Sequence, residues 1–533
     1  MRGWLLVQPK GRMAHTLRWA AFALALAGCG GPTTVRTIPV GAKPGDLTLA
    51  PCTARTDSGP TVADCGTLIV GENPEQSGPR LIALPVIRIR ATTGAVAEPL
   101  LWLEGGPGMS NMRFKPPVAL LNHHDFVMVG YRGVDGSVTL DCPEYARALR
   151  IHAPLSGTSL PTLRESLSRC MARLEAAGFD LGRYTMREVV ADMEAARAKL
   201  GYERVNLLSE SYGTRVAQFY ASLHPDRISR SAMIGVNPPG GFVWEPHTVD
   251  AQLQYYSRLC ARDAACSART SSLAETIRAV NRAMPRRWLL FPIDPDKVQV
   301  AAFVLLFHRK SAAMVFDAYT AAARGDPSGL WLLSTASDFV VPRAFHWGEM
   351  YAKAASADLD TARDYEAEMR PPDGILGSPL SLLQWGSVDV RRWPIPLLPE
   401  DLRRVQRSEV QSLLVSGTVD LSTPAQLATT ELLPSLHHGR QVVLSEFGHT
   451  ADLWQLNPRA TERLLTSFFD TGLADSSLFT YAAMDFRAAP RLPTLAKLLL
   501  GFVSAAAVGI GAAVWFGARW VHRRTVRHSL QAA

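Results

Sequence analysis

Short apolar segments alternate with helix-type segments over much of this 533-residue chain, and this alternation constrains the fold most strongly. Strands of the buried kind separated by helices imply β-α-β units and a mainly parallel sheet, so we predict an α/β fold. Between residues 238 and 404 helical patterns replace the alternation of strands and helices. This predicts a helical lid inserted between two core segments, 46–237 and 405–474. The predicted strands are residues 81–91, 100–103, 126–129, 205–208, 232–236, 412–415 and 442–444, and the clearest helices are 185–200 and 214–224.

The N-terminus has the pattern of a secretory signal. Four basic residues precede and enter a short apolar run that ends at Gly28-Cys29, so we predict a signal peptide over residues 1–28. The stretch 26–29 resembles a bacterial lipobox, which implies that Cys29 is lipidated. The alternative is an ordinary cleaved signal with an incidental cysteine. Residues 29–45, rich in Gly, Pro and Thr, read as a tether.

A second apolar segment lies near the C-terminus. Residues 498–518 contain no charge and as a helix would extend about 31 Å, one hydrocarbon thickness. Four arginines follow in the tail 519–533, and the linker 475–497 precedes the segment. The positive-inside rule puts the tail in the cytoplasm and the rest of the chain outside a bacterial membrane. An apolar helix favours the inner membrane, although Gly30 does not supply the retention signal of some lipoproteins.

The apolar segment also carries a stripe of small residues at every fourth position: Gly501, Ala505, Gly509, Ala513 and Gly517. Such a face lets two membrane helices pack closely, which favours a homodimer. The alternative is that Gly and Ala are merely common in this segment.

The distribution of charge gives no support to a nucleic-acid function. The net charge is +8, but residues 1–28 and 519–533 each hold four basic and no acidic side chains. Residues 29–518 are therefore formally neutral, and the basic excess marks the two ends that orient the chain in a membrane. We expect no nucleic-acid partner and no cofactor.

Six cysteines remain once Cys29 is set aside, and an exported chain meets an oxidising space. Six cysteines allow fifteen disulfide pairings, which the sequence leaves open. Pairing of neighbours is the simplest: Cys52–Cys65, Cys142–Cys170 and Cys260–Cys266. Because no CxxC or HxxxH spacing occurs, we expect no metal site.

The segment 205–214 combines a strand, a tight turn and a helix around Ser209-Glu210-Ser211-Tyr212-Gly213. This arrangement presents the Ser211 hydroxyl at the tip of the turn, as in a nucleophile elbow whose first small residue is serine. Asp420 follows a later strand, and His449 follows the next strand, 29 residues further on. In this order His449 would take the Ser211 proton and Asp420 would orient His449.

Backbone N–H groups must stabilise the negative oxygen that forms when a serine attacks a carbonyl. The amides of Gly106 and Tyr212 are our candidate donors. Gly105, Pro107 and Gly108 shape the loop around Gly106, which follows the strand 100–103.

Together these motifs resemble the α/β-hydrolase superfamily, specifically the proline iminopeptidase and tripeptidyl aminopeptidase-like serine hydrolases. The resemblance covers about residues 50–240 and 405–470 and rests on the motifs 105–108, 210–214 and 417–424. Residues 130–133 (GYRG) depart from the family's usual DQRG, and Glu104 replaces a frequent histidine. The cysteine positions resemble the secreted peptidase branch, which supports neighbour pairing.

In that family acidic side chains hold the free amino terminus of the substrate, which implies such a role for Glu104 and Glu210. Glu349 is a candidate by residue type alone. For Glu210 the alternative is a structural role in the elbow, with a salt bridge to Arg132.

We therefore expect a membrane-anchored extracytoplasmic serine hydrolase that forms an acyl-enzyme, and specifically an aminopeptidase that releases residues from the N-terminus of short peptides. Two alternatives stay open: a carboxylic ester hydrolase on the same triad, and a non-enzymatic anchored binding or scaffold protein on a hydrolase fold. The partners expected are a small peptide or ester and membrane lipid.

Overall fold

A nine-stranded sheet forms the centre of the molecule. The computed structural model describes residues 37–531 apart from 77, 79 and 94–96, so the predicted signal peptide and Cys29 lie outside the described residues. The strand order is β1-β2-β3-β5-β4-β6-β7-β10-β11. The strands are β1 Leu47–Thr56, β2 Gly59–Gly71, β3 Leu81–Ile89, β4 Ala97–Leu103, β5 His124–Val129, β6 Val205–Glu210, β7 Ile228–Ile234, β10 Gln411–Gly417 and β11 Gly439–Leu444.

The sheet is mostly parallel, as the sequence predicted. β5, β4, β6, β7, β10 and β11 pair in parallel, whereas β1, β2 and β3 add antiparallel pairings at one edge. The long hairpin of β1 and β2 was not among the predicted strands. Because parallel strands point their carboxyl ends to one edge, the loops after β4, β6, β10 and β11 gather there.

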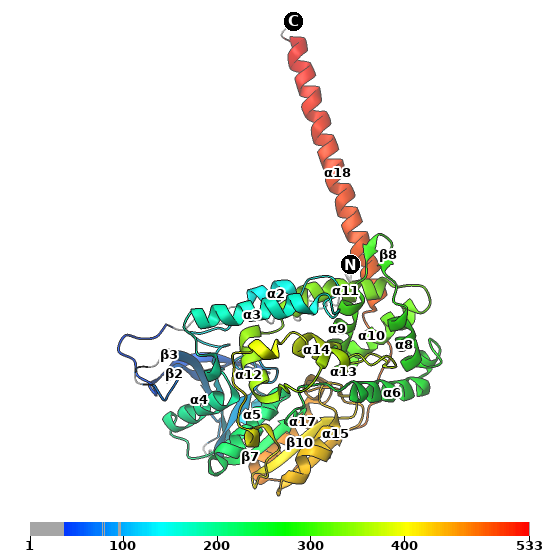
Figure 1. Ribbon diagram of the computed structural model, residues 1–533. Coiled ribbons are helices and arrows are strands. Elements are labelled where there is room, and N and C mark those ends of the chain that lie inside the picture. Colours follow the sequence, from blue (N-terminus) through cyan, green and yellow to red (C-terminus); the bar gives the residue numbers. More distant parts are fainter. Residues whose placement is uncertain (1–36, 77, 79, 94–96, 532–533) are drawn as a thin grey trace, which may run out of the picture.

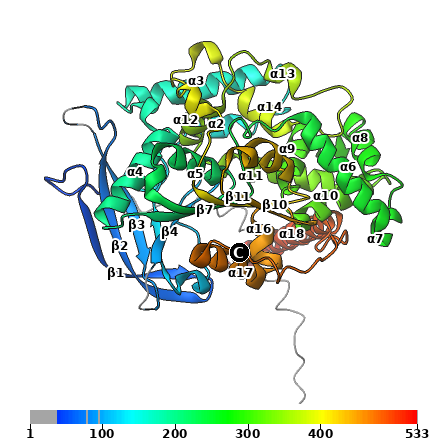
Figure 2. The same cartoon turned by 90° about the horizontal axis from the view of Figure 1, so that it is seen from below.

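Helices cover both faces of the sheet. α4 (Met186–Lys199) and α5 (Tyr212–Leu223) lie on one face, and α16 (Ala451–Leu456) and α17 (Pro458–Thr471) lie on the other (Figure 2). Successive strand residues point to opposite faces. Trp102 accordingly packs in the core with α17, and Leu103 packs in the core with α4 and α5.

Between β7 and β10 the chain is mainly helical, in agreement with the predicted secondary structure of that interval. A two-stranded hairpin, β8 (Arg287–Trp288) and β9 (Phe291–Pro292), interrupts the helices and was not predicted. The helices are α6 Pro246–Arg262, α7 Ala264–Ser267, α8 Leu273–Arg282, α9 Pro295–Leu305, α10 Arg309–Ala322, α11 Ser328–Val340, α12 Trp347–Asp358, α13 Tyr365–Glu368 and α14 Pro379–Trp385. The remaining short helices are α2 Pro143–Ala148 and α15 Ala425–Leu427, and α3 spans Leu160–Ala176.

Three disulfides tie neighbouring segments together: Cys52–Cys65, Cys142–Cys170 and Cys260–Cys266. The first joins β1 to β2, the second joins α2 to α3, and the third joins α6 to α7. Each bond closes a local excursion of the chain, which is the neighbour pairing.

The C-terminal helix α18 (Leu492–Gln531) projects away from the body (Figure 1). Its segment Leu492–Trp520 is long and apolar enough to cross a membrane, with a mean hydropathy of 2.1. It begins six residues before the predicted apolar run, and those first residues are buried on the body at Leu492 and Ala496. A strap, defined here as residues 475–491, leads into α18 across the surface of the body.

Candidate active site

Ser211 lies in the sharp turn between β6 and α5. Its φ of 50° and ψ of −126° put a residue with a side chain in the left-handed region, where glycine is normally favoured. The Ser211 amide donates to the Ile234 carbonyl at 2.9 Å, which ties the turn to the end of β7. A Cβ added to Gly105 would lie 2.6 Å from the Ser211 Cβ, so the loop after β4 closes directly against the turn. The Ser211 side chain is thus presented at the carboxyl edge of the sheet.

Asp420 and His449 form a buried pair at the same edge. The His449 Nδ1 atom lies 2.8 Å from Asp420 Oδ2. Burial acts to lower the pKa of His449, but the charge and hydrogen bond of Asp420 outweigh it and raise that pKa above its ordinary value. Thr423 holds the carboxylate in place, since its amide donates to Oδ1 at 2.8 Å and its hydroxyl donates to Oδ2 at 2.8 Å.

His449 and Ser211 are neighbours through the end of β7. Ser211 is bonded to Ile234, and a Cβ on the next residue, Gly235, would lie 3.0 Å from the His449 ring. Within the described part of the chain the Ser211 hydroxyl forms no hydrogen bond. Catalytic serine–histidine bonds are often long before substrate binds. The structure therefore brings the three predicted residues to one edge, with the base–acid pair already formed.

A loop of the helical interval also contacts His449. The Phe307 carbonyl accepts a hydrogen bond from the His449 amide at 2.6 Å. The His308 ring lies 6.2 Å from the His449 ring, and Asp452 accepts from the Gly448 amide at 2.8 Å. Burial and the proximity of His449 lower the pKa of His308, which favours its neutral form. The position of His449 thus depends on a segment about 140 residues earlier in the chain.

The predicted oxyanion donors lie on either side of Ser211. Tyr212 is the first residue of α5, where an amide N–H has no intrahelical acceptor. Gly106 has a φ of +53° in the loop after β4, and its amide donates no hydrogen bond to the described residues. Pro107 and Gly108 continue the loop, and the Gly108 carbonyl accepts from the His346 amide at 2.9 Å. Within the described residues neither amide donates a hydrogen bond, so both remain free to bind a developing negative oxygen.

Glu104 and Glu210 approach each other beside Ser211. Burial, together with the Glu210 charge, raises the pKa of Glu104 to about 8, while the Gly105 amide donates to Glu104 Oε1 at 2.9 Å. Burial also raises the pKa of Glu210, although Trp454 donates its indole N–H to this carboxylate. The ionised form of a half-buried carboxylate in this setting is stabilised when a cation binds beside it.

The expected salt bridge between Glu210 and Arg132 is wrong. Arg132 instead forms a two-bond pair with Asp192, at 2.7 and 2.6 Å, and both side chains are buried. Glu210 instead accepts a hydrogen bond from the indole N–H of Trp454 on α16. Arg132 satisfies the buried Asp192 carboxylate because a planar guanidinium matches two carboxylate oxygens.

Glu349 is occupied by a different partner. It forms a buried ion pair with Lys353, one turn further along α12. The Lys353 ammonium also lies 4.2 Å from the centre of the Tyr131 ring. Because its charge is already compensated inside the protein, Glu349 is a weaker candidate for holding a substrate amine than Glu104.

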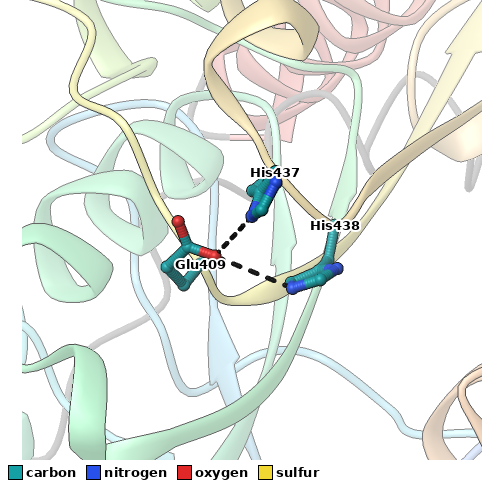
Figure 3. A group of neighbouring side chains, drawn as sticks. All are labelled: Glu409, His437 and His438. Carbon is teal, nitrogen blue, oxygen red and sulfur yellow. Dashed lines mark hydrogen bonds and ion pairs between the residues drawn. The ribbon is translucent and has the colours of Figure 1, made fainter.

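One group of side chains has spacing suitable for a metal ion within the described ranges. Glu409, His437 and His438 lie at the surface, with Glu409 Oε2 2.7 Å from His437 Nδ1 (Figure 3). They lie where β10 and β11 begin, whereas Ser211, Asp420 and His449 follow strand ends. Since these ends are on opposite edges of a parallel sheet, the cluster takes no part in chemistry at Ser211.

Several residues near the candidate site were not assigned roles from the sequence. Thr423 was noted only as part of a motif, and His308, Asp452 and Trp454 had no sequence signal that placed them beside His449 or Glu210. Thr423 acts on Asp420 three residues away, whereas His308, Asp452 and Trp454 make contacts between segments far apart in the chain. Only the position of Asp452 in the chain, three residues after His449, could have suggested it.

Part of the chain is similar to known hydrolases. A family model described as the alpha/beta hydrolase fold matches residues 98–272. The tripeptidyl aminopeptidase of Streptomyces lividans is 28% identical over 218 residues, which cover 37% of this chain and 40% of that protein. The serine protease Hip1 of Mycobacterium tuberculosis is 29% identical over 276 residues, covering 46% and 51% respectively.

Among solved structures, a serine hydrolase from Cycloclasticus zankles matches at 13% identity and a TM-score of 0.35, covering 77% of this chain and all of that one. The chain matches about half or less of the length of its curated relatives. The family-model match agrees with the mostly parallel sheet and the strand–turn–helix at Ser211. Residues 98–272 thus match the alpha/beta hydrolase fold, and parts of the chain are similar to a tripeptidyl aminopeptidase and to the serine protease Hip1.

Proposed function

We propose that this protein is a serine hydrolase that works through an acyl-enzyme on Ser211. The observation that carries the proposal is the buried Asp420–His449 pair, at 2.8 Å, beside a serine held at positive φ. A scaffold protein has no need to keep a strained serine next to an oriented histidine. Strain of this kind is retained where the surrounding structure enforces it for function.

In the proposed mechanism His449 removes the Ser211 proton as the oxygen attacks the carbonyl carbon of the substrate. Asp420 keeps the His449 tautomer correct and stabilises the imidazolium that forms. The amides of Gly106 and Tyr212 bind the developing negative oxygen. His449 then gives its proton to the leaving group. Water next attacks the acyl-enzyme in the same way, with His449 again as the base, and releases the acid from Ser211.

We further propose that the substrate is a short peptide with a free amino terminus, and that the enzyme is an aminopeptidase. Glu104 supports this, because its carboxylate accepts from the amide of Gly105, the residue that lies against Ser211. Burial and the Glu210 charge raise the pKa of Glu104 to about 8, and an ammonium group bound there would offset both effects by stabilising the ionised carboxylate. The peptidase names of two relatives agree with this substrate class. An ester hydrolase would gain nothing from a carboxylate at this position.

For the location, we propose that α18 spans a bacterial membrane, with the catalytic body outside and the basic tail inside. The apolar segment Leu492–Trp520 supports the span, and the arginines at 519–527 support the orientation. Lipidation of Cys29 would add a second anchor to the same side.

The test of substrate class compares Glu104→Gln with wild type on matched substrates. We expect KM for free-amine aminoacyl anilides to rise roughly 10-fold or more, because one charge-assisted contact is lost, with little change for N-acyl esters. Glu203→Gln, an exposed substitution before β6, is the matched control. Equal loss on both substrate types would remove Glu104 from amine recognition. Turnover of acyl esters with no detectable turnover of any aminoacyl anilide would favour the esterase.

A further inference from the structure

The β8–β9 hairpin exposes two leucines at its tip. Leu289 and Leu290 form the two-residue loop between the strands, and Leu290 is 92% exposed. In water, burial of side chains of this size is worth about 1.5–3 kcal/mol each, so solvent alone disfavours this placement. The tip is therefore an unusual use of two large apolar residues.

The turn itself also disfavours leucine. Leu289 has a φ of +54° at the first position of the loop, a position that favours glycine in two-residue hairpins. A branched side chain is present where both backbone strain and exposure argue against it. Leu289 thus carries both a backbone-strain cost and an exposure cost. We take these two costs to indicate that its side chain makes a contact outside the body.

The base of the hairpin is rigid. Trp288 is buried, and its ring lies 5.1 Å from that of Trp331 on α11, while the Phe291 ring lies 5.2 Å from Trp331. These aromatic contacts fix the hairpin to α11. The direction in which Leu289 and Leu290 project is thus set by the fold rather than by a flexible loop.

The same helix holds the start of α18. Lys497 on α18 pairs with Asp326 just before α11 at 2.6 Å, and Pro493 packs against Gly329. Figure 1 shows the hairpin beside the point where α18 leaves the body, and projecting toward the same side. The exposed apolar residues of α18 begin at Leu498. The leucine tip and the first membrane-facing turns of α18 are therefore neighbours.

Two basic residues precede the leucines in the hairpin. Arg286 and Arg287 are exposed, and neither forms an ion pair within the part of the chain that the structure describes. Arginine next to apolar and aromatic side chains is typical of a segment at a membrane interface, where the cation meets anionic headgroups. Charge and apolarity thus point to the same ligand.

We propose that the β8–β9 hairpin inserts Leu289 and Leu290 into the outer leaflet of the membrane that α18 crosses, with Arg286 and Arg287 at the headgroups. The proposal rests on the proposed membrane-spanning role of α18. A second contact beside the helix restricts how the body tilts on the membrane. Because α10, which follows Phe307 and His308, packs on α11, the contact also sets the orientation of the catalytic edge.

The experiment uses the full-length protein in nanodiscs of phosphatidylethanolamine and phosphatidylglycerol. Single cysteines carry an environment-sensitive fluorophore at Leu290→Cys, at Val508→Cys on α18 and at Val62→Cys on β2. All three positions are exposed, and β2 lies at the far side of the body from the hairpin (Figure 1). Doxyl-labelled lipid is then added as a membrane quencher.

We expect blue-shifted, quenched emission at Leu290 and Val508 and unquenched emission at Val62. Quenching at Val508 with an unquenched Leu290 would overturn the hairpin proposal while leaving the membrane span intact. An unquenched Val508 would overturn the span itself, and the hairpin proposal with it. Replacement of Leu289 and Leu290 by serine should leave turnover of a small soluble substrate unchanged, so that misfolding is recognised separately.

Discussion

At the scale of single residues, the backbone of Ser211 is where the fold stores free energy. A non-glycine residue at φ 50° and ψ −126° costs on the order of 1–3 kcal/mol, which packing around it must offset. The offset comes from the Ser211 amide bond to Ile234 and from the close approach of Gly105. These tightly packed surroundings fix the position of the Ser211 hydroxyl.

Asp420 controls the protonation of His449, and this gives a pH prediction. Burial lowers the pKa of His449 and Asp420 raises it, so Asp420→Asn should let that pKa fall. Activity needs neutral His449, and the acidic limb of the kcat/KM profile should therefore move to lower pH. The rate on the plateau should drop on the order of 10³- to 10⁴-fold, because the tautomer is no longer enforced.

The measurement is the pH dependence of kcat/KM for the variant and for wild type. Asp470→Asn is the control, since Asp470 bonds His123 and His124 away from the triad and should leave the profile unchanged. An unshifted acidic limb in Asp420→Asn would mean that another group sets the protonation of the base.

At the scale of elements, the packing of α5 on β4 depends on a glycine. A Cβ on Gly213 would lie 2.2 Å from the Leu103 carbonyl oxygen and 2.7 Å from that of Glu104. Both are backbone atoms, so the first turn of α5 would have to move away from β4. The close approach is what aligns the loop after β4 with Ser211.

Gly213→Ala should therefore destabilise the protein by about 2 kcal/mol or more and also reduce kcat. Gly182→Ala is the control, because a Cβ there makes only ordinary contacts, at 3.4 Å or beyond, and its φ is not positive. Thermal unfolding followed by circular dichroism measures the first effect. A Gly213→Ala melting temperature equal to that of wild type would show that the elements separate more easily than the geometry indicates.

The helices and strands also show how much of the fold could be predicted from the sequence alone. The buried strands and the Ser211 turn were predicted because continuous apolar runs and turn residues are local signals. β1 escaped prediction because it is half exposed, contains Pro51 and mixes threonines with apolar residues. The contacts of His308 with His449, of Trp454 with Glu210 and of Arg132 with Asp192 join distant segments, and no local pattern encodes them.

At the scale of the whole molecule, the strap connects the catalytic edge to α18. The Arg309 guanidinium donates to the carbonyls of Ala482 and Ala483, at 3.1 and 2.6 Å, and its amide donates to Asp452. Glu446, three residues before His449, binds the strap through the Met484 amide at 2.6 Å. The path from α18 to the loop of His449 is thus a chain of direct contacts.

Arg309→Met should release the strap, since a buried cation with two backbone acceptors is lost. We expect new proteolytic cleavage within residues 475–491, detected by mass spectrometry after limited proteolysis. Lys310→Met, an exposed substitution at the next residue, should leave the cleavage pattern of wild type. A strap equally resistant in Arg309→Met would show that Glu446 and the ion pair of Arg491 with Asp317 suffice to hold it.

The central claim is that Ser211 is the nucleophile of a working triad, and covalent labelling tests it most directly. Folded full-length protein is treated with a fluorophosphonate, and the site of the adduct is mapped by peptide mass spectrometry. We predict one adduct on Ser211, absent in Ser211→Ala and retained in Ser209→Ala, because the Ser209 hydroxyl bonds the Ala232 carbonyl and no other group among the described residues. Folded wild-type protein that takes up no label, or that carries it on another residue, would contradict the account.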